Sequence, residues 1–189
     1  MCVNSSVKRV CRIPDIVCCL SFILCHSAPF AQESSSSIQK VIPALQNSYR
    51  YEAITNYKQA ISSVENIDFP QEYAYLKFAR LGWLHYLNCN YSAAVSFYQK
   101  ADETMETSIE AKEMLLTCYY LLQDYSKAEG MARKILNISP ENYPARIKLA
   151  QLAMLNLNYN EAAFHLQKIT EQFPSDYSAN SLLLLCYTA

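Results

Sequence analysis

Three blocks of the sequence recur at one constant spacing, and this period limits the possible folds more than any other feature. Each block opens with asparagine or aspartate followed by tyrosine, at Asn90, Asp124 and Asn158. Within the blocks, the same spacing separates Ala94, Ala128 and Ala162, and also Ala101, Ile135 and Ile169. A period of this length, about 34 residues, is typical of a solenoid of stacked supersecondary units.

Each period has room for two helices. The pairs Leu81-Gly82, Leu115-Leu116 and Leu149-Ala150 recur thirteen residues before the three alanines. Small residues near the middle of two helices let the helices pack closely, so each unit is expected to be a helix hairpin. Polar residues mark the turn inside the hairpin, and Pro140 and Pro174 end two of the units because proline cannot continue a helix.

This pattern resembles the tetratricopeptide repeat, a unit of about 34 residues with a bulky residue, Leu-Gly, Tyr, Ala, an aromatic residue, Ala and Pro at fixed offsets. The unit that starts at Tyr75 fits at Phe78, Leu81, Gly82, Ala94, Tyr98 and Ala101. The unit from Ile109 fits at Leu115, Tyr119, Ala128 and Pro140, and the unit from Tyr143 fits at Leu149, Ala150, Ala162 and Pro174. Lys112 and Arg146 depart from the pattern because they occupy the bulky position.

The resemblance implies an all-α fold, a right-handed superhelical solenoid of helix-turn-helix units. We expect complete repeats at residues 75–108, 109–142 and 143–176, and a partial repeat or C-terminal capping helix at residues 177–189. Residues 32–74 are expected to form a divergent helical hairpin and a connection, as solenoid ends are often atypical. In that hairpin Pro43 interrupts the first helix, and Ala53 stands for the repeat alanine although its distance from Ala94 exceeds one period. Seven extra residues would then lie near Pro70.

Residues 1–31 have the layout of a secretory signal peptide. Lys8, Arg9 and Arg12 precede an apolar stretch from Ile16 to Cys25, and small residues follow up to Ala31. Roughly 20 apolar residues are needed to span a bilayer, so this stretch is too short to do so. We expect cleavage after Ala31 or after Ala28, and an exported, periplasmic or secreted protein with no membrane span after cleavage. The alternative is an upstream extension from a misplaced start codon.

The charge of the mature chain argues against a nucleic-acid partner, and the positions of its cysteines predict their chemical state. Without residues 1–31, 13 basic and 16 acidic side chains remain, and no basic stripe is present to bind nucleic acid. Cys89, Cys118 and Cys186 also remain. Cys118 and Cys186 occupy the same position two units apart, too far for a disulfide, and we expect them to be buried apolar residues. Cys89 falls in a turn and is expected to be a free thiol.

No pattern in the sequence points to catalysis. His85 and His165 have no cysteine, aspartate or glutamate nearby at the spacing of metal ligands. Two glycines in the whole chain cannot form a phosphate-binding loop. We therefore expect no enzyme activity, no cofactor and no metal.

A binding role follows from the resemblance, because stacked hairpins line a concave groove with the first helix of each unit. The groove residues that this implies are Trp83, Tyr86, Glu113, Thr117, Tyr120, Gln151 and Met154, with Ala79 and Ile147 beside them. They are mainly aromatic or apolar, which disfavours capture of a terminal carboxylate. The alternative for Trp83 is a contact with the N-terminal part of the same chain.

Two functions are compatible with this groove. The first is a non-catalytic scaffold or adaptor that binds a protein segment outside the cytoplasm. The second is the N-terminal structural arm of a larger or truncated repeat protein whose active or membrane part lies beyond Ala189. Self-association through the incomplete C-terminal repeat is a further possibility.

Overall fold

The computed structural model describes residues 39–189, and every regular element in that range is helical. Residues 39–53 form the first helix. The elements that follow are α2 (Tyr57–Glu65), the short helix η1 (Gln71–Tyr73), α3 (Ala74–Leu87), α4 (Tyr91–Thr104), α5 (Ile109–Leu121), α6 (Tyr125–Ile138), α7 (Tyr143–Leu155), α8 (Tyr159–Gln172) and α9 (Tyr177–Thr188). The expected signal peptide, residues 1–31, lies outside the described residues.

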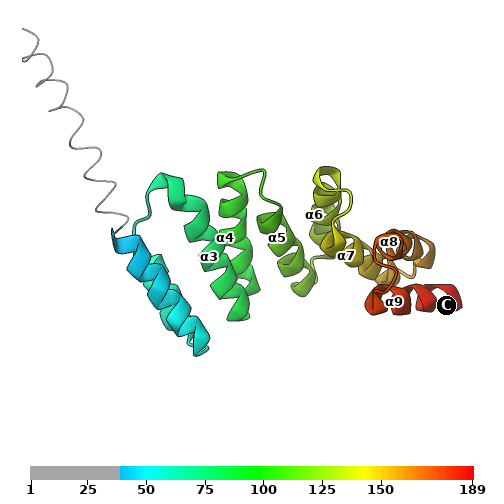
Figure 1. Ribbon diagram of the computed structural model, residues 1–189, viewed down its shortest axis with the longest axis horizontal. Coiled ribbons are helices and arrows are strands. Elements are labelled where there is room, and N and C mark those ends of the chain that lie inside the picture. Colours follow the sequence, from blue (N-terminus) through cyan, green and yellow to red (C-terminus); the bar gives the residue numbers. More distant parts are fainter. Residues whose placement is uncertain (1–38) are drawn as a thin grey trace, which may run out of the picture.

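The helices form antiparallel hairpins that follow one another along the long axis of the molecule (Figure 1). From α2 to α9 each helix packs against the next, and α5 also contacts α7 directly. Such contacts between the first helices of successive units, together with those inside each hairpin, are the packing of a helical solenoid. The predicted all-α solenoid is confirmed.

The turn inside each hairpin has the same backbone conformation in all four complete hairpins. Thr55, Cys89, Gln123 and Leu157 all adopt a positive φ between 57° and 60°. In the turn after α3, the amide of Cys89 donates to Tyr86 O and the amide of Asn90 donates to His85 O, the pair of bonds that closes a Schellman motif. The Asn90 side chain then accepts from the amide of Ala93 and caps α4. One asparagine therefore closes one helix and opens the next.

The N-terminal hairpin follows the same register as the others. Thr55 precedes Cys89 by one period, and Ala60, with none of its surface exposed, precedes the equally buried Ala94 by one period. The prediction that Ala53 occupies this position is wrong, because Ala53 is exposed next to the turn. No seven-residue insertion is needed. The hairpin differs because α2 is nine residues long where α4 has fourteen.

Residues 39–53 are helical throughout, so the prediction that Pro43 interrupts this helix is also wrong. Val41 and Ala44 on either side of the proline are buried. Pro43 itself is exposed. The proline therefore lies on the outer side of a helix whose other side packs into the core.

Small residues set the distance between paired helices. An added Cβ on Gly82 in α3 would lie 2.8 to 3.0 Å from three ring atoms of Tyr98 in α4, so the ring occupies the space that a side chain would need. Ala94, Ala128 and Ala162 have no exposed surface. This packing agrees with the role of small residues expected from the sequence.

The two cations at the bulky position of the repeat are part of the structure of the connections between units. Lys112 is buried, and its ammonium contacts Asp102 Oδ1 at 2.5 Å and the carbonyl of Glu106. Arg146, also buried, donates to the carbonyl of Pro140 at 2.6 Å. One period later the Asn180 amide donates to Pro174 O at 2.9 Å. In all three units, a polar side chain therefore donates to a backbone carbonyl of the connection that precedes its helix.

Cys118 and Cys186 are buried free thiols, as expected, and Cys89 is an exposed one. Burial raises the pKa of the Cys118 thiol to about 11, so it stays protonated near neutral pH. Within residues 39–189, none of the helices is both long and apolar enough to pass through a lipid bilayer.

Candidate functional site: the face lined by the first helices

The predicted groove residues come from the first helix of three successive hairpins, and two clusters form among them. The first joins Trp83 and Tyr86 of α3, whose rings stack with centroids 5.5 Å apart. Tyr86 continues to Tyr91, the first residue of α4, at 5.8 Å. Trp83 has 36% of its surface exposed, which is high for a large aromatic side chain in a packed helix pair.

Trp83 also contacts the N-terminal hairpin. Its indole Nε1 donates to Glu52 Oε1 at 2.9 Å. Glu52 Oε2 lies 2.5 Å from Arg80, a buried guanidinium one turn before Trp83. Arg80 in turn covers the ring of Tyr49 at 3.9 Å. The expected alternative, a contact of Trp83 with the N-terminal part of the chain, is therefore present, while part of its ring remains open to solvent.

The second cluster brings together Tyr120 of α5 and Gln151 and Met154 of α7. These three line a shallow open hollow of about 260 Å³, with Leu155 and Leu182 completing the wall. Pockets for small ligands typically measure about 300 to 1,000 Å³ and enclose the ligand. A smaller, open hollow of this kind suits a single side chain.

Lys148 forms the polar edge of the second cluster. Its ammonium lies 4.0 Å from the centroid of the Tyr120 ring and 3.1 Å from Gln151 Oε1. Burial lowers the pKa of Lys148, and burial is also the main reason that the pKa of Tyr120 is raised. Both groups are partly withdrawn from water, and Tyr120 also packs against the main hydrophobic core.

Glu113 and Thr117 do not line the hollow. The Glu113 carboxylate accepts from the Asn142 amide at 2.6 Å, a bond between α5 and the residue that caps α7. The Thr117 hydroxyl donates to the backbone oxygen of Glu113 at 2.9 Å. These contacts give Glu113 a structural role between two units. Sequence reasoning missed Lys148 and Leu155 because the repeat pattern places neither of them among the groove positions that it considered.

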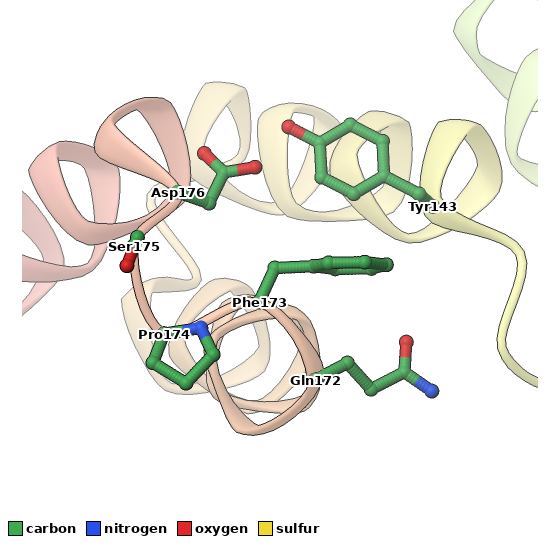
Figure 2. A pocket seen from close by; sticks show the side chains of 6 residues that line it. All are labelled: Tyr143, Gln172, Phe173, Pro174, Ser175 and Asp176. Carbon is green, nitrogen blue, oxygen red and sulfur yellow. The ribbon is translucent and has the colours of Figure 1, made fainter.

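A second and larger hollow, of about 590 Å³, lies between the start of α7 and the connection from α8 to α9. In Figure 2 the ring of Phe173 lies next to that of Tyr143, and the Tyr143 hydroxyl points toward the side of Asp176. The two rings meet edge to face at 6.1 Å. Gln172, Pro174 and Ser175 complete the lining.

The polar contacts around this hollow are those of the repeat itself. Asp176 caps α9, and its carboxylate accepts a hydrogen bond from the amide of Ala179. This bond is the main reason that the pKa of Asp176 is lowered. Two units earlier, the Tyr75 hydroxyl lies 2.7 Å from Ser108 Oγ, and Ser108 caps α5 in the same way. A tyrosine next to the cap of the following unit is therefore a recurring link between units. We assign this hollow a structural role.

The two histidines of the described chain lie apart from both clusters. Burial lowers the pKa of His85 and of His165, so both are neutral near pH 7. His85 stacks on Phe97 at 5.1 Å. In residues 39–189, histidine, cysteine, aspartate and glutamate side chains do not gather into a group of three or more that could hold a metal ion.

The sequence profile of the tetratricopeptide repeat family matches residues 124–185. Residues 124–185 therefore match this family in sequence, and the described residues share the solenoid fold of solved tetratricopeptide-repeat proteins. Proteins of this class generally serve as interaction scaffolds without catalytic activity. A search of curated proteins finds no match.

Solved structures with the same fold include several repeat proteins. The crystal structure of MamA protein superposes with a TM-score of 0.71 at 14% identity, covering 79% of this chain and 82% of MamA. A tetratricopeptide repeat protein from Parabacteroides merdae gives a TM-score of 0.70 at 20% identity, covering 79% of this chain and 61% of that protein. YrrB, described as a repeat protein with an unusual peptide-binding site, gives 0.64 at 16% identity, with 85% and 82% covered.

Proposed function

We propose that this protein is a scaffold that binds a segment of another protein along the face lined by α3, α5 and α7. The observation that carries the proposal is the hollow formed by Tyr120, Gln151 and Met154, because side chains from two successive units create it together. An extended segment that crosses several units can place one side chain in such a hollow and lay others on Trp83 and Tyr86. Aromatic residues at interfaces often contribute most of the affinity.

Leu155 provides a specific test because it lines the hollow and is 54% exposed, so its replacement removes little core packing. Ile138, 51% exposed at the end of α6 and away from the hollow, provides the matched control. Peptides selected from a random phage-displayed library on the full chain are the probes. We expect Leu155→Asn to weaken peptide binding about tenfold, a typical effect for an interface anchor. Ile138→Asn should leave the affinity unchanged.

The readout can be local, because Trp83 is the single tryptophan of the sequence. Binding along this face should change the intensity or wavelength of Trp83 fluorescence in a titration. Peptides that bind with equal affinity to wild type and Leu155→Asn, and that leave the fluorescence unaltered, would place the binding surface elsewhere and refute the proposal.

We further propose that the protein acts outside the cytoplasm, in the periplasm or as a secreted protein. The support is the basic, apolar and small-residue order of residues 1–31. Mass spectrometry of the protein made in its own host should find an N-terminus near Gln32. A cytoplasmic product that retains Met1 would rule out export.

Self-association is a second candidate, supported by the exposed apolar side chains of α9. Leu184, Leu185 and Tyr187 are 65%, 51% and 62% exposed. The helix has no charged side chain, so two copies would meet without charge repulsion. Sedimentation analysis of the full chain should then show a dimer that Leu184→Glu dissociates. A monomer at all concentrations would leave this face to another partner, such as further units of a larger protein.

A further inference from the structure

Lys148 lies at the edge of the hollow, and the side chains that its ammonium contacts are neutral. Arg80 and Lys112 each contact a carboxylate at 2.5 Å, and Arg133 contacts Glu129 at 2.7 Å. Lys77 and Arg146 donate to backbone carbonyls of the connections between helices. The Lys148 ammonium instead donates to the Gln151 amide oxygen and lies over the face of the Tyr120 ring. Within residues 39–189, no carboxylate oxygen lies within 4.0 Å of its ammonium.

This environment favours an incoming anion. An ammonium that has lost part of its hydration gains more from a carboxylate than an exposed ammonium does, because the local dielectric constant is lower and less water must be displaced. Burial lowers the pKa of Lys148 without a compensating contribution from an acidic group. A carboxylate bound here would therefore raise that pKa.

The cation and the hollow share two residues. Tyr120 and Gln151 contact the Lys148 ammonium and also line the hollow, whose remaining wall is the apolar group Met154, Leu155 and Leu182. When one side chain of a bound segment occupies the hollow, a neighbouring residue of that segment can therefore reach the Lys148 ammonium. The site offers one charged contact next to one apolar contact.

We infer that this part of the binding face recognises an acidic-aliphatic segment, meaning an internal stretch of a partner protein in which aspartate or glutamate lies next to a large apolar residue. The carboxylate pairs with Lys148, and the apolar side chain enters the hollow. This inference rests on the proposed function and specifies the chemistry of the partner.

The surroundings of Lys148 favour a side-chain carboxylate over a chain terminus. Recognition of a terminal carboxylate usually uses several donors that converge on its two oxygens. Those of residues 39–189 that line the hollow carry no charge, so Lys148 beside it is the charged donor, and its neighbour Gln151 already uses its amide oxygen to accept from Lys148. Leu182 on α9 forms one wall of the hollow, and on the other side the proposed binding face continues toward Trp83 on α3. A bound segment can therefore continue past the hollow toward α3.

The test uses peptides selected on the full chain from a random phage-displayed library. We expect the selected sequences to be enriched in aspartate or glutamate beside leucine, methionine, isoleucine or phenylalanine. Each peptide is then made in three forms: unmodified, with the acidic residue changed to its amide, and with an amidated C-terminus. Affinity is measured against wild type, Lys148→Met, Lys148→Arg and Leu155→Asn, with thermal unfolding of each variant to verify the fold.

Loss of the acidic side chain should weaken binding about tenfold, and Lys148→Met should have the same effect, while Lys148→Arg retains most of the affinity. The two losses should not add in the amide peptide bound to Lys148→Met, because both remove the same pair. C-terminal amidation should have no effect. If amidation of the C-terminus abolishes binding, the carboxylate is a terminal one and the inference is wrong.

The outcomes separate this inference from the proposed function. Peptides that lose affinity with Leu155→Asn but bind equally to wild type and Lys148→Met would preserve the binding face and refute the acidic contact. Peptides insensitive to both variants would refute the binding face itself. In either case the fold assignment is unaffected.

Discussion

The two glycines of the chain should respond to the same substitution with opposite signs. Gly82 and Gly130 are both helical, so replacement by alanine gains about 1 kcal/mol in each from the backbone preference alone. At Gly130 nothing lies within 4 Å of the added Cβ. Gly130→Ala should therefore stabilise the protein by about 1 kcal/mol.

At Gly82 the added Cβ would meet Tyr98 ring atoms at 2.8 to 3.0 Å. Tyr98 is 3% exposed, so its ring has no free space into which to shift. Overpacking of this kind costs typically about 1 to 3 kcal/mol. Set against the backbone gain, Gly82→Ala should destabilise the protein by about 1 kcal/mol.

Thermal unfolding followed by circular dichroism measures both effects. For a chain of this length, about 1 kcal/mol corresponds to a shift in Tm of about 2 to 4 °C. The two variants should therefore move in opposite directions from wild type. Tyr98→Leu should relieve the contact, so that Gly82→Ala costs less in that background than in wild type. If Gly82→Ala stabilises the protein as much as Gly130→Ala, the close approach of α3 and α4 is wrong.

Two further changes test the turn and the buried histidine. Leu157 has a φ of 59° and is 72% exposed. Because the left-handed conformation costs a leucine about 1 to 2 kcal/mol, Leu157→Gly should raise the free energy of unfolding in urea by up to about 1 kcal/mol. A lower free energy of unfolding would contradict the turn geometry. Burial lowers the pKa of His165 below 6.5, so its contribution to stability is complete above pH 6.5 and is lost as the pH falls through the folded-state pKa. His165→Phe should therefore show a smaller drop in Tm between pH 7 and pH 5 than wild type, and an equal drop would assign the pH dependence to other groups.

The solenoid could be predicted from the sequence because close packing limits which residue types fit at the repeated positions, so the period is visible there. A position with no exposed surface between two helices, such as Ala94 or Ala128, accepts few residues and repeats visibly. The register of the N-terminal hairpin was harder to predict, because Ala53 and Ala60 both match the repeat alanine. The early end of α2 also removes the second half of the repeat pattern. The positive φ at Thr55 would have given the register, but residue type did not reveal it.

The candidate site was predicted only in outline. Periodicity places Trp83 and Tyr120 on the first helices of their units, but their contacts depend on side chains from neighbouring units. The bond from Trp83 to Glu52 and the contact of Tyr120 with Lys148 join residues that the repeat pattern does not relate. Lys112 was treated as a departure from the pattern because residue type alone does not show that its buried stem carries the ammonium to Asp102 and a connection carbonyl.

The most direct test of binding along this face is photo-crosslinking in the native host. A benzophenone amino acid in place of Tyr120 lies at the hollow, and the same amino acid in place of Phe164, which is 54% exposed on α8, is the control at a distant surface. We predict a discrete crosslinked partner from position 120, absent from position 164 and lost when Leu155→Asn is added. Crosslinking from position 164 alone, or from both positions regardless of Leu155→Asn, would contradict binding along the face lined by α3, α5 and α7.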